Sequence, residues 1–327
     1  MRLLLMTLFL AMLVAGCGDA TETTAPQRPG ADFPVTIEHK FGTTEVPDAP
    51  KRVVAVGFND QDFALALGVK PVGVRQFQGG IDITDRPWAK DELAGAEPQI
   101  VGAEELELEK IAALRPDVIL GVYSGLTKSE YSTLSKIAPT IAQSDDYVDF
   151  GMPWQEQAET ISHALGRDEP GTKVVGAVEQ QFAQARTRHP EFDGSSFALA
   201  SASAGKVFVY GSQDLRSRFF TSLGFRVPAE IADLTGDSFY APVGEENMEL
   251  LDQDVLVVYG TPADVEALPL LRRAAVAREG RIVYLDATGD FANALGFSSP
   301  LSLPFALDRG VPRLAAAIDG DPATPTD

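Results

Sequence analysis

The body of the chain alternates short apolar runs with segments of helical periodicity, and this alternation limits the possible folds more than any other feature. Residues 53–56 and 118–120 are aliphatic runs too short for helices, and they fit buried strands. Similar runs occupy residues 72–74, 197–200, 255–258 and 282–285. Helical patterns occupy residues 60–67, 109–114, 129–137 and 154–165. Strands that alternate with helices predict parallel α/β units.

One longer segment separates the two α/β halves. Residues 170–190 contain no helix breaker between the flanking prolines except Gly171 and Gly176. Apolar residues recur there at helical spacing, at Val174, Val178, Phe182 and Ala185. We predict a single helix of about 19 residues, roughly 28 Å long. The fold class is therefore α/β, with two similar lobes joined by one long helix and modest motion between the lobes.

A short sequence pattern occurs once in each half of the chain, and we call this repeat the internal echo. Glu109 begins a short helical pattern that is followed by Asp117 and an apolar strand, and Glu246 is followed in the same way by Asp254 and a strand. An acidic residue in the first turn suits the helix dipole, which is the simplest explanation of both glutamates. The equal spacing in both halves indicates that the lobes are similar.

The N-terminus has the form of an export signal. Arg2 precedes an apolar run over residues 3–14, which is too short to span a bilayer. The run ends in small residues followed by Cys17, and this resembles the lipobox of bacterial lipoproteins. The resemblance implies a signal peptide over residues 1–16 and two acyl chains on the cysteine. Two chains anchor a protein stably where one is marginal.

The remaining boundaries follow from composition. Residues 17–32 are rich in Thr, Ala and Pro and fit a lipidated tether, while residues 321–327 fit a disordered tail. We expect the N-terminal lobe over residues 33–169, the connecting helix over 170–190 and the C-terminal lobe over 191–320. The formal net charge of -20 argues against nucleic acid as a partner. The single cysteine excludes an internal disulfide, so the lobes depend on their cores.

Motifs for catalysis and metal binding are absent from the sequence. There is no Gly-x-Ser-x-Gly elbow, no phosphate-binding Gly-Lys-Ser/Thr loop and no His-Glu-x-x-His, so nothing in the sequence proposes an enzyme. Only three histidines occur, which argues against a receptor for a bare metal ion. A haem receptor stays open, because one tyrosine in the cleft would serve as an axial ligand.

An ordered set of segments resembles the class III substrate-binding proteins of ABC importers for ferric siderophores and cobalamin. The segments are Pro-Lys-Arg-Val-Val-Ala at 50–55, residues 66–73, 108–117, 164–167 and 250–255, and Ser-Pro-Leu-Ser-Leu-Pro-Phe-Ala-Leu at 299–307. The resemblance covers about residues 35–318, and it implies a ligand cleft between the two lobes. It implies a binding protein that captures a ferric siderophore and delivers it to an ABC importer, and it implies no catalytic activity. The ligand arrives already chelated, so no resident cofactor and no protein ligand to the metal are expected.

The expected ligand-binding residues lie in loops at the carboxyl ends of predicted strands, where two-lobed α/β proteins bind ligands. Arginines would contact the chelating oxygens, and aromatic rings would pack on the ligand. Several of the rings also fit the core, and each arginine also fits a solvated surface. The candidates are Phe58, Arg75, Phe77, Arg86, Trp88, Tyr123, Tyr210, Arg216, Arg218 and Tyr240.

The resemblance also implies the partners and the location. Glu109 and Glu246 match the exposed glutamates, one on each lobe, that meet arginines of the two permease subunits in this family. We expect a monomer held by lipid at the outer face of the bacterial cytoplasmic membrane. A cobalamin or haem receptor of the same architecture, and an adhesion or signalling lipoprotein without a small ligand, are the alternatives. The sequence does not distinguish a catecholate siderophore from a hydroxamate.

Overall fold

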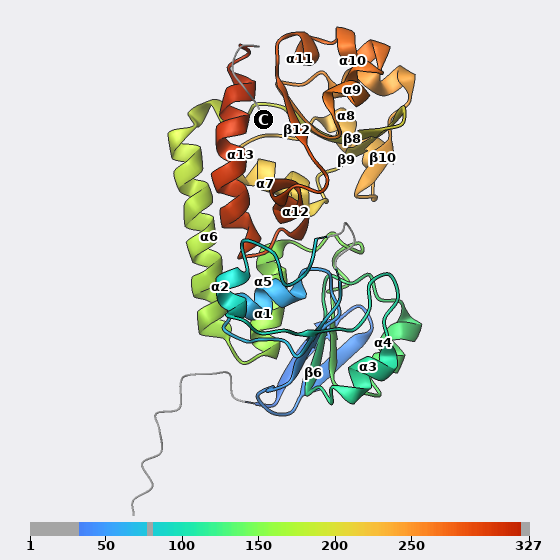
Figure 1. Cartoon of the computed structure of the whole chain (residues 1–327), viewed down its shortest axis with the longest axis vertical. Helices are drawn as coiled ribbons and strands as arrows, with labels where there is room; N and C mark the ends of the chain where they lie inside the picture. Colours follow the sequence, from blue (N-terminus) through green and yellow to red (C-terminus); the bar gives the residue numbers. More distant parts are fainter. Residues whose placement is uncertain (1–32, 77–80, 322–327) are drawn as a thin grey trace, which may run out of the picture.

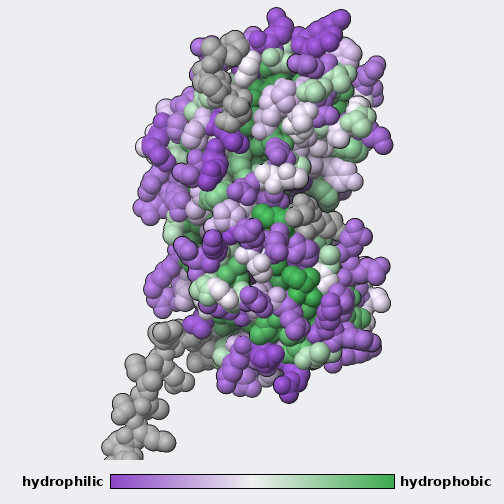
Figure 2. Space-filling model, viewed as in Figure 1, coloured by the Kyte–Doolittle hydropathy of each residue, from purple (hydrophilic) through white to green (hydrophobic). Residues whose placement is uncertain are grey.

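The computed structural model describes residues 33–76 and 81–321, and these form two α/β lobes stacked along the long axis of the molecule (Figure 1). The predictions for Cys17 and Phe77 lie outside the described residues. No helix among the described residues is both long enough and apolar enough to cross a membrane. Figure 2 shows hydrophilic side chains over most of the visible face, with apolar residues gathered near the waist and in the N-terminal lobe.

The N-terminal lobe is built on a five-stranded parallel sheet with the order β5-β4-β3-β6-β7. A separate antiparallel hairpin precedes it, formed by β1 (Val35–His39) and β2 (Gly42–Val46). The sheet strands are β3 (Val53–Ala55), β4 (Gly73–Val74), β5 (Gln99–Ile100), β6 (Val118–Gly121) and β7 (Thr140–Ala142). The helices are α1 (Asp60–Ala66), α2 (Lys90–Leu93), α3 (Leu108–Ala113), α4 (Lys128–Leu134) and α5 (Trp154–Ala164).

The C-terminal lobe has a five-stranded mixed sheet with the order β10-β9-β8-β11-β12. β8 (Phe197–Ser203), β11 (Val255–Tyr259) and β12 (Ile282–Leu285) are parallel, whereas β9 (Lys206–Tyr210) and β10 (Tyr240–Pro242) form antiparallel pairs at one edge. The short helices are η1 (Pro190–Phe192), α7 (Leu215–Ser222), α8 (Ala229–Thr235), η2 (Glu245–Leu251), α9 (Pro262–Glu266), α10 (Pro269–Arg273), α11 (Ala275–Arg278) and α12 (Asp290–Phe297).

Two long helices run along one side of the molecule. α6 (Asp168–Arg188) spans both lobes in Figure 1, and α13 (Ser302–Ile318) lies against it beside the C-terminal lobe. The 21 residues of α6 correspond to roughly 31 Å. Acidic residues occupy its first turn and arginines its last, which suits the helix dipole. The helix begins two residues earlier than the sequence predicts, because Asp168 and Glu169 form its first turn. It also ends two residues earlier, because Pro190 disfavours a helical conformation at His189.

One apolar core continues through both lobes. It joins Phe63 of α1 and Trp88 to Phe297 of α12 and Leu303 of α13. A smaller apolar cluster lies on the opposite face of each sheet, one in each lobe. A continuous core resists separation of the lobes, because opening it would expose apolar surface at about 25 cal/mol per Å². The lobes are therefore held together by packing as well as by α6.

Candidate functional site

Three predicted residues meet at the carboxyl ends of the strands in the N-terminal lobe. Phe58 follows β3, Arg75 follows β4, and Tyr123 follows β6. The Phe58 backbone N–H donates a hydrogen bond to the Tyr123 carbonyl oxygen at 2.9 Å, and the Arg75 guanidinium carbon lies 4.2 Å from the centre of the Phe58 ring. The parallel sheet thus brings two rings and one cation to a single edge.

The Arg75 side chain is held in place by backbone carbonyls. Nε donates to the Ala103 oxygen at 2.7 Å, and Nη2 donates to the Glu104 oxygen at 2.6 Å. No carboxylate of the described residues lies within ion-pair distance of it. Burial lowers the pKa of Arg75, and the more distant Glu130 carboxylate partly offsets this. Arg75 is therefore a fixed cation without a carboxylate partner in the described part of the chain, which suits contact with an electron-rich ligand.

Tyr210, Arg216 and Tyr259 form a compact group in the C-terminal lobe. The Arg216 guanidinium carbon lies 4.0 Å from the Tyr210 ring centre and 5.5 Å from the Tyr259 ring centre. Asp214, which caps α7, accepts hydrogen bonds from Arg216 Nε at 2.9 Å and from Arg216 Nη2 at 2.7 Å. Burial lowers the pKa of Arg216, but the Asp214 carboxylate outweighs it and the pKa is raised. Arg216 therefore stays charged, but Asp214 already neutralises it.

A row of aromatic rings crosses from one lobe to the other through Phe150. Its ring centre lies 6.2 Å from that of Phe58, 5.2 Å from that of Tyr123 and 6.4 Å from that of Phe239 in the C-terminal lobe. The Phe239 ring in turn lies 4.8 Å from Tyr240. We call these five residues the ring row. Phe150 has a φ of 66°, a left-handed conformation that is uncommon without glycine and tends to occur at functional sites.

Other contacts support this crossing between the lobes. Arg218 Nη2 donates to the Gly151 carbonyl oxygen at 3.0 Å, beside Phe150. Burial raises the pKa of Tyr123, and Asp214 of the opposite lobe raises it further while Arg216 opposes the change. Tyr123 is therefore a neutral phenol that faces the charged pair of the other lobe. Tyr240, predicted as a ligand contact, is 43% exposed at the far end of the ring row.

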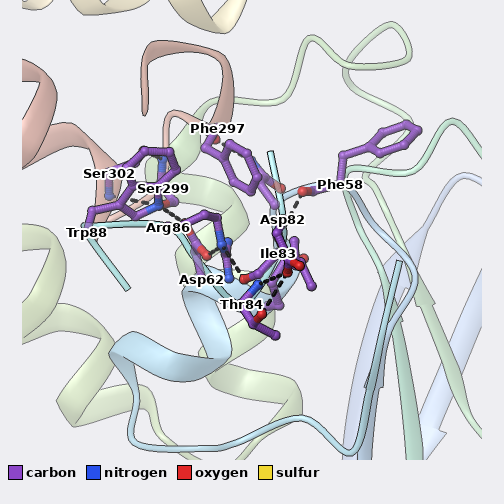
Figure 3. Close-up of polar contacts among 12 residues, drawn as sticks. Phe58, Asp62, Asp82, Ile83, Thr84, Arg86, Trp88, Phe297, Ser299 and Ser302 are labelled. Atoms are coloured by element: carbon purple, nitrogen blue, oxygen red, sulfur yellow. Dashed lines mark hydrogen bonds and ion pairs between the residues drawn. The ribbon is translucent and has the colours of Figure 1, made fainter. Parts of the chain in front are cut away.

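Two predicted ligand contacts, Arg86 and Trp88, are corrected by the structure. Arg86 is 1% exposed and forms an ion pair with Asp62, and Trp88 is 7% exposed and donates Nε1–H to Asp62 Oδ2 at 2.8 Å (Figure 3). The Trp88 ring packs on Phe297 and Phe305. The polar groups of both side chains bind Asp62 inside the contact between the lobes, so neither is available to bind a ligand.

Phe150 and Phe239 are the site residues that sequence reasoning missed. Phe150 follows segment 144–149, which holds three aspartates, and precedes Gly151, and a large ring next to so many charges is the signal that would have identified it. Phe239 directly precedes the predicted Tyr240. Among the described residues, no group of three or more His, Cys, Asp or Glu side chains is placed to hold a metal ion.

The two echoed glutamates occupy corresponding places. Glu109 lies in the first turn of α3, before β6, and Glu246 lies in the first turn of η2, before β11. Both are exposed. β6 and β11 pair in parallel with β3 and β8, the first sheet strands of their lobes. The first helix is α-helical and the second is a 3₁₀ helix, so the echo lies in position and not in helix type.

The model of the periplasmic binding protein family matches residues 54–288. The chain belongs to this family. Its members are substrate-binding proteins, and the two-lobed architecture with a sheet in each lobe agrees with this membership.

Several relatives of this periplasmic binding protein are iron-uptake proteins. The probable siderophore-binding lipoprotein YfiY of Bacillus subtilis is 25% identical over 271 residues, which cover 80% of this chain and 79% of the relative. The ferric-anguibactin-binding protein FatB of Vibrio anguillarum is 27% identical over 292 residues, which cover 82% and 84%. PiaA of Streptococcus pneumoniae in complex with ferrichrome has a TM-score of 0.77 and 27% identity, covering 88% of this chain and 99% of that one. A periplasmic solute binding protein of Mycobacterium smegmatis has a TM-score of 0.76 and 33% identity, covering 87% and 99%.

A buried carboxyl group beside the ring row gives the protein a pH-dependent stability. Burial raises the pKa of Asp60 to about 6, although backbone N–H groups of Tyr123, Val122 and Gly57 oppose this. An acid whose pKa is higher in the folded state than in the unfolded state binds more protons when folded. The contribution of Asp60 to the free energy of unfolding therefore falls by about 3 kcal/mol as the pH rises from about 4 to above 6. Urea denaturation across this pH range measures the effect. The free energy of unfolding of Asp60→Asn should depend less on pH than that of wild type, and an equal pH dependence would contradict a raised pKa of Asp60.

Proposed function

We propose that this protein is a lipid-anchored receptor that captures a ferric siderophore between its lobes and delivers it to an ABC importer for iron uptake. The observation that carries the proposal is the ring row, which crosses from one lobe to the other beside the fixed Arg75 cation. A pre-chelated ferric ion needs flat apolar contacts and donors to its chelating oxygens, and it needs no protein ligand to the metal. Iron-siderophore relatives such as YfiY and FatB support the same ligand class.

The ligand class is tested by retention of radioactive iron. The purified protein would be mixed in separate samples with iron-55 complexes of ferrichrome, of citrate and of a tris-catecholate, and with haem or cobalamin, which are followed by their visible absorbance. Each sample would then be passed through an ultrafiltration membrane. We expect stoichiometric retention of at least one ferric siderophore and no retention of haem or cobalamin. Retention of cobalamin or haem alone would favour the alternative receptors. Retention of none would favour a lipoprotein without a small ligand.

Arg75 should carry more of the binding free energy than Arg216. Arg75 has no carboxylate partner among the described residues, whereas Arg216 is neutralised by Asp214. Loss of a hydrogen bond from a charged group costs about 1.5–3 kcal/mol. Arg75→Ala should therefore lower the affinity for the retained ligand by about 10- to 150-fold. Arg273→Ala, on the exposed face of α10, is the matched control. Equal affinity of Arg75→Ala and this control would remove Arg75 from the site.

The lipid anchor is tested at Cys17. Cys17→Ser keeps the size of the side chain but removes the sulfur that would carry the diacylglycerol. We expect the variant to incorporate no labelled palmitate and to appear in the soluble fraction of the producing cells. Wild type should be labelled and membrane-bound. Labelling of the serine variant would contradict an anchor at Cys17. The N-terminal segment would then be an ordinary signal peptide that happens to contain a cysteine.

A further inference from the structure

The first turn of α1 concentrates buried polar side chains. Asn59, Asp60, Gln61 and Asp62 follow one another in the chain, and all are 1% exposed or less. Burying four polar side chains in succession is costly unless they form hydrogen bonds. These residues hydrogen-bond to separate parts of the molecule, and we call them the α1 turn.

Two residues of the α1 turn bind the C-terminal lobe. Asn59 Nδ2 donates to the Phe297 carbonyl oxygen at the end of α12 at 2.8 Å. The Ser299 hydroxyl donates to Asp62 Oδ2 at 2.8 Å, on the carboxylate that also binds Arg86 (Figure 3). The residues of the C-terminal lobe in these bonds are more than 200 positions away in the sequence.

The other two residues of the α1 turn bind the loops that carry the ring row. Asp60 accepts the backbone N–H groups of Val122 at 2.8 Å and Tyr123 at 3.0 Å. Gln61 Nε2 donates to the Phe58 carbonyl oxygen at 2.9 Å. A single helical turn thus touches the C-terminal lobe with its first and last members and the ligand-facing loops with its middle members.

We propose that the α1 turn is a positioning element that couples the contact between the lobes to the placement of Phe58 and Tyr123. The turn is short and fully packed, so a shift at Asp62 or Asn59 is transmitted to Asp60 and Gln61 within one turn of helix. Seating of Ser299 on Asp62 therefore fixes the two rings of the N-terminal lobe in register with those of the C-terminal lobe. Coupling between sites is reciprocal, so a ligand that packs on these rings also stabilises the seating of Ser299. The ligand-related part of this inference rests on the proposed function, and the coupling itself does not.

The chain offers a matched pair of variants for the test. Ser299 and Ser302 form a reciprocal turn, in which the Ser299 N–H donates to the Ser302 hydroxyl at 2.9 Å and the Ser302 N–H donates to the Ser299 hydroxyl at 3.0 Å. Both residues are completely buried. Each Ser→Ala change removes one buried hydroxyl from this turn, but only Ser299→Ala removes a bond to Asp62.

Hydrogen–deuterium exchange of the full chain without ligand measures the coupling. In Ser299→Ala we expect the Val122 and Tyr123 amides to exchange about tenfold faster or more, relative to the sheet amide of Ile119, because an anchoring bond to a charged group is lost. In Ser302→Ala the same ratio should stay as in wild type.

Unchanged Val122 and Tyr123 ratios in Ser299→Ala would overturn the proposal, and so would an equal rise in both variants. Normalising to Ile119, whose N–H donates to the Pro139 oxygen inside the sheet, removes the effect of a general loss of stability. Because no ligand is present, the outcome is independent of whether the protein binds a ferric siderophore.

Discussion

Replacing Arg86 by methionine should lower the free energy of unfolding by about 3–5 kcal/mol, the cost of leaving a buried charge without its partner. Asp62 is completely buried, and in the variant it would keep donors from Trp88 and Ser299 but no counter-charge. Burial already lowers the pKa of Arg86 and the Asp62 carboxylate offsets this in part, so each charge depends on the other. Urea denaturation at pH 7 measures the loss.

A double variant separates the attraction between the two charges from the cost of burying them. Arg86→Met together with Asp62→Leu removes both charges and fills the space with apolar atoms, and such replacements are often neutral or stabilising. We expect the double variant to recover only part of the stability lost in Arg86→Met, because the Trp88 Nε1–H and the Ser299 hydroxyl lose Asp62 as their acceptor. A single variant within 1 kcal/mol of wild type would mean that the carboxylate finds other partners.

Reversing the charge of Glu109 and Glu246 together should abolish delivery while leaving capture intact. We propose that these exposed carboxylates, one on each lobe, meet basic pockets of the two permease subunits. Complementary charges fix orientation and raise the rate of encounter, and like charges in contact cost several kcal/mol. Iron uptake by cells that carry Glu109→Arg and Glu246→Arg should therefore fall at least about tenfold, with ligand affinity unchanged.

Neighbouring glutamates provide the control for this experiment. Glu105 and Glu249 are also exposed and lie close to the two positions along the chain. Glu105→Arg with Glu249→Arg adds the same charge to the same regions, so a specific contact predicts near-normal uptake for this pair. Equal loss in both double variants would indicate a general electrostatic effect. Normal uptake in Glu109→Arg with Glu246→Arg would leave both residues as helix-start carboxylates.

The strands at the centre of each sheet were predictable because their apolar runs are local and continuous. All six predicted strands are present, since β3, β4, β6, β8, β11 and β12 are buried aliphatic segments. The antiparallel hairpins were missed, although β1 and β9 alternate buried and exposed residues in the pattern of half-buried strands. β5 has two exposed residues and carries no such signal.

The site was most predictable where a residue follows a predicted strand directly. Phe58, Arg75 and Tyr123 follow predicted strands, and their edge position fixes where they meet. Arg86 and Trp88 have the composition of a binding loop, but their partner Asp62 lies 24 and 26 positions away, so no local pattern indicates the pairing. Phe150 reaches the ring row through a loop conformation that no local pattern specifies.

The order of the chain has a consequence for when the receptor becomes competent. Phe297, Ser299 and Phe305, which complete the surface between the lobes, lie later in the chain than the N-terminal lobe that they cover, so they emerge after it during synthesis. Until they emerge, Trp88 and the Asp62–Arg86 pair face the surroundings on an N-terminal lobe with nothing seated on them. A stalled chain ending before residue 297 would thus present an apolar, protease-sensitive face. Only chains extended past residue 305 can complete the surface between the lobes.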